Sequence, residues 1–130
     1  MPELTEDQAR ALADEFLKAS EAVSDYRFQS GESLSNDDVL ALKSLQYKLA
    51  NQSDDFTGVA IKLTLQDLQQ TVAQIVKITG QAREAIATLN DVRRAVSIAA
   101  NLVALGEAIA AGNPAGILAA VQNTKSSLSG

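Results

Sequence analysis

The chain contains 130 residues, of which 46% are apolar and 21% charged, and it has 7 Gly, 2 Pro and no Cys, His or Trp. This length fits one domain with an ordinary core, and the apolar fraction excludes wholesale disorder. Without His and Cys, the chain lacks the commonest general base near neutral pH, thiol nucleophiles, disulfides and thiolate metal sites. Any catalysis would rest on Asp, Glu, Lys, Tyr, Ser or Thr side chains.

The net charge of −5 is carried by the first half of the chain. Residues 1–65 contain 12 acids and 6 bases, whereas residues 66–130 contain 4 acids and 5 bases. An acidic chain with five aromatics and no basic cluster is a poor nucleic-acid binder, so we expect no nucleic-acid partner. Residues 1–7 are acidic and lack an apolar core, so we expect no secretory signal peptide. The compartment stays open.

The first helix is predicted over residues 5–29. Thr5 and Gln8 have the spacing of a capping box, in which side chains satisfy backbone groups at a helix start. An apolar stripe follows at steps of three and four residues, as expected for a packed helix face: Ala9, Leu12, Phe16, Ala19, Val23 and Tyr26. The stripe ends before Ser30 and Gly31, where we expect the helix to end.

A second helix is predicted over residues 36–52. Ser35 is a good N-cap, because its hydroxyl can accept a hydrogen bond from an amide of the first turn. The apolar stripe then runs out in the polar residues 51–55. We therefore expect the second helix to end there, with Ser53 or Asp54 capping the next one.

The third and fourth helices are predicted over residues 54–79 and 81–111. Gly80 resembles a helix end, because glycine adopts the left-handed conformation that often follows the last turn. The apolar register nevertheless runs unbroken through Gly80, which leaves a single helix over about 55–111 as the alternative. Such a helix would be roughly 85 Å long, which is too long for a compact domain of this size.

The last helix is predicted over residues 114–127. Gly112 fits the position just past a helix end, Asn113 fits an N-cap and Pro114 fits the first helical position. The tail from about residue 127 should fray.

No strand pattern competes with these helices. We therefore predict an all-α fold: an up-and-down bundle of four to five helices, with four long helices and the last packed across them. The bundle forms a single domain over residues 1–130. Its expected core consists of Leu12, Phe16, Leu42, Leu68, Val72, Leu89 and Val96.

Residues 95–121 need a specific explanation, because they contain ten alanines and a single charge, Glu107. A buried helical hairpin explains them best, since small residues let helices approach closely. A self-association surface or a membrane-inserting hairpin are the alternatives. The uncharged runs on either side of Glu107 are 12 and 14 residues long. Because a standing span needs about 20 apolar residues, we expect no transmembrane span.

Two acid pairs are the best candidates for catalysis or metal binding. Asp37-Asp38 and Asp54-Asp55 both stand at expected helix starts, where the helix dipole favours acids without any ligand. Adjacent helical residues also point in different directions, which weakens a joint site. Tyr26 and Tyr47 are expected at the edge of the core, with the hydroxyl in water. We therefore predict no catalytic residue, no metal site and no cofactor.

No motif places the chain in a known family. Its long helices, low aromatic content and Ala/Gly-rich hairpin resemble those of helical bacterial toxins and secreted assembly proteins in composition alone. The sequence is interpreted as a non-enzymatic helical bundle that acts through protein–protein contacts or self-association. The alternative is a membrane-active, pore-forming-like protein that uses the hairpin of residues 95–121.

Glu107 tests the interpretation of this hairpin. Its helical neighbours at three and four residues are alanines and Val103, which cannot pair with a carboxylate. We predict that Glu107 is exposed, because a carboxylate buried without a partner is strongly disfavoured. Glu107→Gln should then change the free energy of unfolding by less than about 0.5 kcal/mol in urea denaturation. A change of several kcal/mol would show that the carboxylate is buried.

Overall fold

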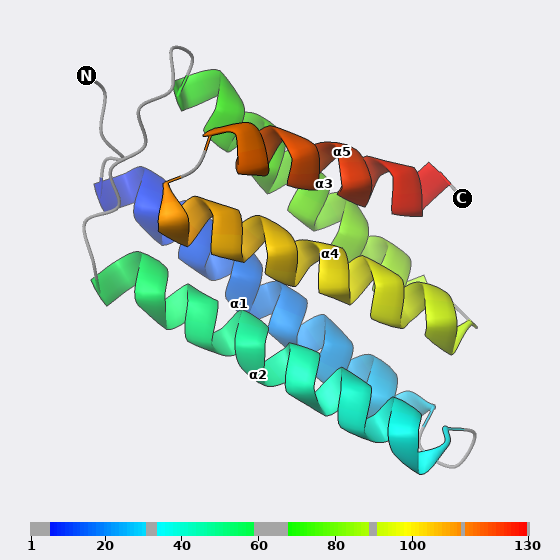
Figure 1. Cartoon of the computed structure of the whole chain (residues 1–130). Helices are drawn as coiled ribbons and strands as arrows, with labels where there is room; N and C mark the ends of the chain where they lie inside the picture. Colours follow the sequence, from blue (N-terminus) through cyan, green and yellow to red (C-terminus); the bar gives the residue numbers. More distant parts are fainter. Residues whose placement is uncertain (1–5, 31–33, 59–67, 89–90, 113, 130) are drawn as a thin grey trace.

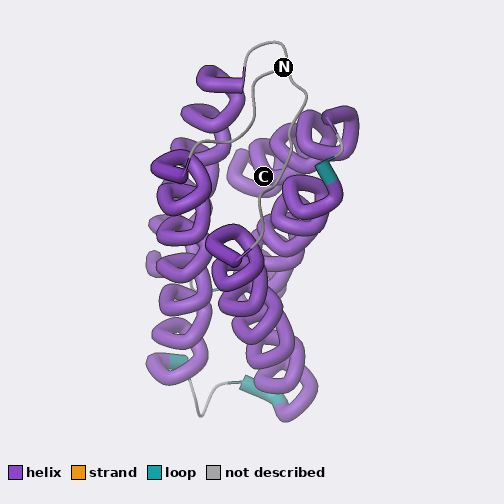
Figure 2. The backbone as a smooth tube through the Cα atoms, turned by 90° about the vertical axis from the view of Figure 1, so that its left-hand side faces the viewer, coloured by secondary structure: helices purple, strands orange, loops and turns teal. Residues whose placement is uncertain are grey.

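A computed structural model describes residues 6–30, 34–58, 68–88, 91–112 and 114–129. Within these ranges the chain forms five helices: α1 (Glu6–Gln29), α2 (Asn36–Gly58), α3 (Leu68–Thr88), α4 (Val92–Ala111) and α5 (Pro114–Ser129). Successive helices run in opposite directions, as Figure 1 shows. The described loop residues lie at the two ends of the bundle (Figure 2). The predicted all-α, up-and-down bundle is therefore confirmed.

The helices are not arranged around the core in chain order. α1 packs along both α2 and α3, and α2 also packs along α4. The consecutive helices α2 and α3 lie at opposite corners, so the four long helices follow the order α1, α2, α4, α3 around the core. α5 packs on α4 and α3 and so covers that side of the bundle, as expected for a last helix packed across the others (Figure 1).

The expected core is largely confirmed where the structure describes it. Buried side chains include Leu12, Phe16, Leu42 and Val72. Phe16 meets Phe56 edge to face, with ring centroids 5.1 Å apart, a favourable geometry for aromatic pairs. Val96 is only partly buried and packs against the edge of the core. The side chains of Leu68 and Leu89 lie outside the described residues.

The expected end of the second helix near residue 52 is wrong, because α2 continues to Gly58. Two of the polar side chains in residues 51–55 donate hydrogen bonds to neighbouring helices instead. Ser53 Oγ donates to the carbonyl oxygen of Ala13 on α1 at 2.6 Å, and Gln52 Nε2 donates to that of Val103 on α4 at 2.9 Å. Ser53 therefore joins α2 to α1 and Gln52 joins α2 to α4, and neither residue caps a helix.

The expected helix end at Gly80 is also wrong, since α3 runs through this glycine to Thr88. Thr79 is buried and donates its hydroxyl hydrogen to the carbonyl of Ile75, so it stays within the helical pattern. The single helix over 55–111 is equally wrong. α4 has its own N-cap, Asp91, whose carboxylate accepts from the backbone amide of Arg93 at 3.0 Å.

The other helix ends agree with the sequence, except at the C-terminus. Ser35 Oγ accepts from the backbone amide of Asp38 at 3.1 Å, which confirms the N-cap of α2. Gly112 is left-handed (φ 66°, ψ 33°), and Pro114 begins α5. α5 extends to Ser129, two residues beyond the expected end, and the hydroxyl of Ser127 accepts from Asn101 of α4 at 3.0 Å; fraying of the tail stays a prediction. Thr5 and Asn113, the other predicted caps, lie outside the described residues.

The side chain of Gln52 on α2 packs directly against Gly106 on α4. A Cβ at this glycine would overlap the side-chain amide of Gln52, the same group that donates to Val103. Gly80 is different, because a Cβ there would meet only Arg83 Nη2, at an ordinary contact distance of 3.7 Å. The two helical glycines therefore have different roles: Gly106 makes room for Gln52, and Gly80 occupies an unobstructed helical position.

Alanine at these two glycines should change stability in opposite directions. Gly80→Ala should stabilise the protein by about 0.5–1 kcal/mol, because alanine loses less backbone entropy in a helix. Gly106→Ala should destabilise it by about 1–3 kcal/mol, because Gln52 must move and leave buried polar groups unpaired. Urea denaturation of both variants measures these changes.

Gln52→Ala provides the matched background for this comparison. In that background the added methyl group at position 106 meets no amide, so Gly106→Ala should become neutral or stabilising. An unchanged penalty would contradict the role assigned to Gln52. A loss of stability in Gly80→Ala would mean that α3 is broken at this position.

Candidate functional site

The two acid pairs lie at least 16 residues apart along α2, which separates them by about 24 Å. Asp37 and Asp38 lie in the first turn of α2, where the helix dipole explains them. Asp54 and Asp55 lie inside α2 and are exposed, so the expectation that they start a helix is wrong. Within the described residues, no group of three or more acidic side chains is placed to hold a metal ion.

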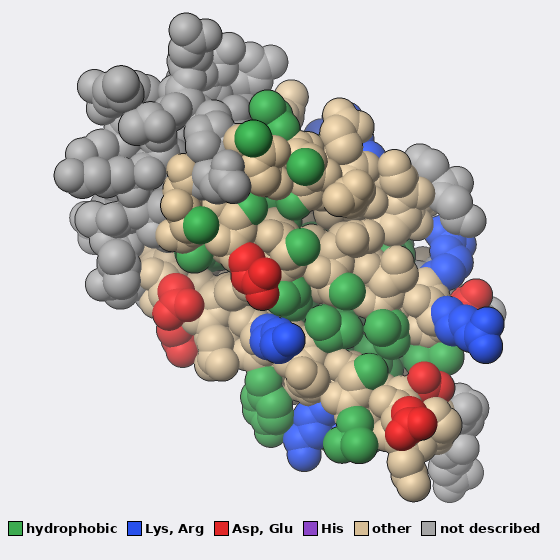
Figure 3. All heavy atoms as spheres, in the orientation of Figure 1, with side chains coloured by type: hydrophobic (Ala, Val, Ile, Leu, Met, Phe, Trp, Pro, Cys, Tyr) green, Lys and Arg blue, Asp and Glu red, His purple; other side chains and the backbone are tan. Residues whose placement is uncertain are grey.

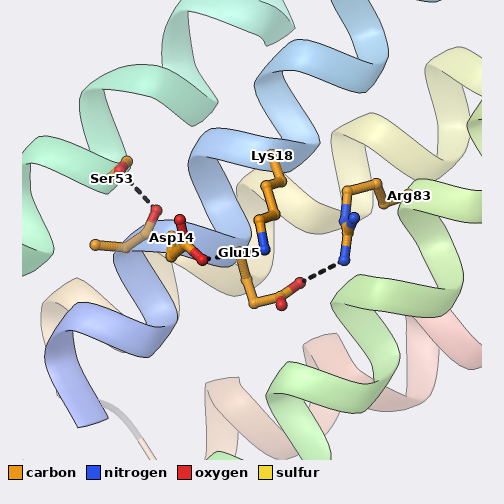
Figure 4. Close-up of polar contacts among 6 residues, drawn as sticks. Asp14, Glu15, Lys18, Ser53 and Arg83 are labelled. Atoms are coloured by element: carbon orange, nitrogen blue, oxygen red, sulfur yellow. Dashed lines mark hydrogen bonds and ion pairs between the residues drawn. The ribbon is translucent and has the colours of Figure 1, made fainter. Parts of the chain in front are cut away.

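A groove of about 440 Å³ runs between α1 and α3. Its floor includes Arg83, whose Nη2 lies 3.2 Å from Oε2 of Glu15, a contact that joins the two helices (Figure 4). Charges of both signs line it: Lys18, Glu21, Asp25, Arg83 and Glu84. Because these charges oppose one another at close range, the groove offers no strong field of either sign to a charged ligand.

The first arm of the hairpin of residues 95–121, which belongs to α4, packs its bulky side chains inside the bundle, whereas Leu118 in the second arm is exposed. The buried residues of α4 include all of its leucines and isoleucines: Ile98, Leu102, Leu105 and Ile109. The exposed positions carry mainly alanines and Glu107, which confirms the predicted exposure of Glu107. α4 is, among the described residues, the one helix long and apolar enough to cross a membrane, and 44% of its most apolar stretch is buried. α4 thus has the length and composition of a membrane span, while its leucines and isoleucines are buried in the bundle.

Large hydrophobic side chains are instead exposed on the first two helices. Four of the five such side chains among the described residues belong to α1 and α2, with exposed fractions of 44% for Leu17, 73% for Phe28, 65% for Leu40 and 57% for Tyr47. Figure 3 shows hydrophobic side chains next to basic ones along the lower edge of the molecule, over α2. We call the surface formed by Leu17, Phe28, Leu40 and Tyr47 the outer face.

Helical periodicity places each pair on one side of its helix. Leu17 and Phe28 are eleven residues apart, which at 100° per residue leaves them about 20° apart around α1. Leu40 and Tyr47 are seven residues apart, which again leaves them about 20° apart around α2. Both pairs point away from the core, since Tyr47 lies about 160° around α2 from the buried Leu49.

Two hydrogen bonds fix the register of α1 against α2. Ser53 donates to the carbonyl of Ala13, and Ser20 Oγ donates to the carbonyl of Gln46 at 3.0 Å. A step from Ala13 to Ser20 on α1 therefore corresponds to a step from Ser53 back to Gln46 on α2, as expected for antiparallel helices. In this register Leu17 lies within two residues, about 3 Å, of the level of Tyr47. Phe28 lies equally close to the level of Leu40, so the outer face contains two apolar clusters.

Tyr47 shows what sequence reasoning missed. Tyr26 is buried, as expected of a core-edge residue, but Tyr47 is largely exposed, so its expected place at the core edge is wrong. The signal was present in the sequence, since the four residues of the outer face stand off the core stripes at spacings of seven and eleven. That these two surfaces adjoin depends on the pairing of α1 with α2, which the sequence does not give.

Comparison with models of known families, with curated proteins and with solved structures finds no match. The function is therefore argued from the surface of this chain alone.

Proposed function

We propose that this chain is a non-enzymatic helical-bundle protein that acts through protein–protein contacts made by the outer face. One observation carries the proposal: four of the five exposed large hydrophobic side chains in the described residues lie on the α1–α2 pair. Contiguous exposed apolar surface on a folded domain typically marks an interaction site, whereas single exposed residues do not.

The composition and rigidity of the outer face also support this function. Phe and Tyr are enriched at the centres of protein interfaces, where a ring contributes large apolar area for few rotatable bonds. The Phe28 ring is held by Arg27, whose guanidinium carbon lies 4.9 Å from the ring centroid. Because all four side chains stand on packed helices, little backbone entropy is lost when a partner binds.

Polar substitutions on the outer face should abolish binding without unfolding the protein. Leu40→Ser and Tyr47→Ser should each change the free energy of unfolding by less than about 1 kcal/mol, because the side chains are exposed. In a pull-down from the native source, both variants should lose the protein that the wild-type chain captures. The captured protein is identified by mass spectrometry. A second copy of the chain itself also counts as a captured partner.

Leu118→Ser is the matched control, since Leu118 on α5 is also 55% exposed but lies apart from the outer face. This variant should retain the captured protein. Loss of capture in Leu118→Ser alone would contradict the proposal and place the contact surface on α5.

Membrane activity through residues 95–121 is a second candidate, which the length and composition of α4 support. This function requires α4 to leave α2, which breaks the Gln52–Val103 hydrogen bond and exposes the buried leucines. On the primary proposal we expect no dye leakage from anionic vesicles at neutral or mildly acidic pH. Leakage that Gly106→Ala increases by loosening the α2–α4 contact would favour the membrane function instead.

A further inference from the structure

We propose that the partner of the outer face is a second copy of this chain, related by a two-fold axis that runs parallel to the helices. This inference rests on the proposed function, since it names the protein that the outer face binds. In the resulting dimer, α1 of each copy packs on α2 of the other. The two α1–α2 pairs therefore stack face to face and form a four-helix interface.

The arrangement of the apolar side chains fits this symmetry. An axis parallel to the helices exchanges α1 and α2 between the copies and keeps each residue at its level along the bundle. Leu17 therefore meets Tyr47 of the second copy, because the two residues already lie at nearly the same level. Phe28 meets Leu40 of the second copy for the same reason. Each apolar side chain is thus covered by another one.

Charge complementarity selects this axis. Glu21 and Lys43 are both exposed, and they stand between the two apolar clusters. In the register fixed by the serine hydrogen bonds, Glu21 lies within two residues of the level of Lys43. The proposed axis places Glu21 opposite Lys43 of the second copy, twice per dimer. An axis across the helices would place Glu21 opposite Glu21 and Lys43 opposite Lys43, and these like charges would repel each other.

The size of the surface is sufficient for a dimer. α1 has 24 residues, so the pair of helices is about 36 Å long and, at about 10 Å per helix, about 20 Å wide. That area, on the order of 700 Å², is close to the roughly 800 Å² that each partner buries in a standard interface.

Charge reversal tests the proposal, with sedimentation velocity as the measurement. The wild-type chain should form a dimer whose dissociation constant rises with salt, because exposed ion pairs are screened. Glu21→Lys and Lys43→Glu should each raise the dissociation constant about tenfold or more, because every Glu21–Lys43 contact becomes a contact between like charges. The double variant Glu21→Lys/Lys43→Glu should dimerise like the wild type.

Mixing the two single variants gives the decisive comparison. In a mixed dimer, the new lysine of one copy faces the new glutamate of the other, and the unchanged Lys43 and Glu21 also face each other. The mixture should therefore form heterodimers under conditions where each variant alone is monomeric. Changes within one copy cannot produce this rescue. Lys48→Glu is the control for net charge, since Lys48 is exposed on α2 but lies about 140° around the helix from Lys43.

Any of three results would overturn the proposal. The first is a wild-type chain that stays monomeric up to about 1 mM, well above the dissociation constants of standard interfaces. The others are equal association of the wild-type and single-variant chains, or no heterodimer in the mixture. If the chain is monomeric but captures another protein that Leu40→Ser and Tyr47→Ser lose, only the identity of the partner is wrong. If those two variants change no binding at all, the proposed function fails as well.

Discussion

The architecture depends on the close contact between α2 and α4 at Gly106. Because this glycine has no side chain, the Gln52 amide fits against α4 and donates to the carbonyl of Val103 inside the bundle. Pairing α2 with α4 leaves α3 at the opposite corner beside α1, and α5 then covers the side between α3 and α4. A single small residue therefore makes room for the hydrogen bond that joins α2 to α4.

This arrangement also determines which surface is left for binding. The leucines and isoleucines of α4 are used against α2 and the core, so α4 exposes mainly alanine over residues 95–111. α5 covers one side of the bundle, but no described helix covers the α1–α2 side. The outer face is consequently the place where large hydrophobic side chains gather without a role in folding.

The parts of the fold that could be predicted are those governed by local rules. The N-cap at Ser35 and the left-handed Gly112 depend on neighbouring residues only, and both are readable in the sequence. The errors at Ser53 and Gly80 have a different origin. The local sequence of Ser53 predicts a cap, but its hydroxyl donates to a carbonyl on another helix. The local sequence of Gly80 predicts a helix end, but the buried residues around it keep α3 helical, since packing overrides propensity.

The position of the outer face likewise depends on packing between helices, which local sequence rules do not predict. Tyr47 and Leu17 could be recognised as residues off the core stripes, yet nothing local says that they lie side by side.

The most direct test of the proposed dimer is the concentration dependence of assigned methyl resonances in NMR. The account predicts that the methyl signals of Leu17 and Leu40 shift together on dilution while those of Leu118 stay fixed. Shifts at Leu118 without any at Leu17 and Leu40, or no shift at any of them, would contradict it.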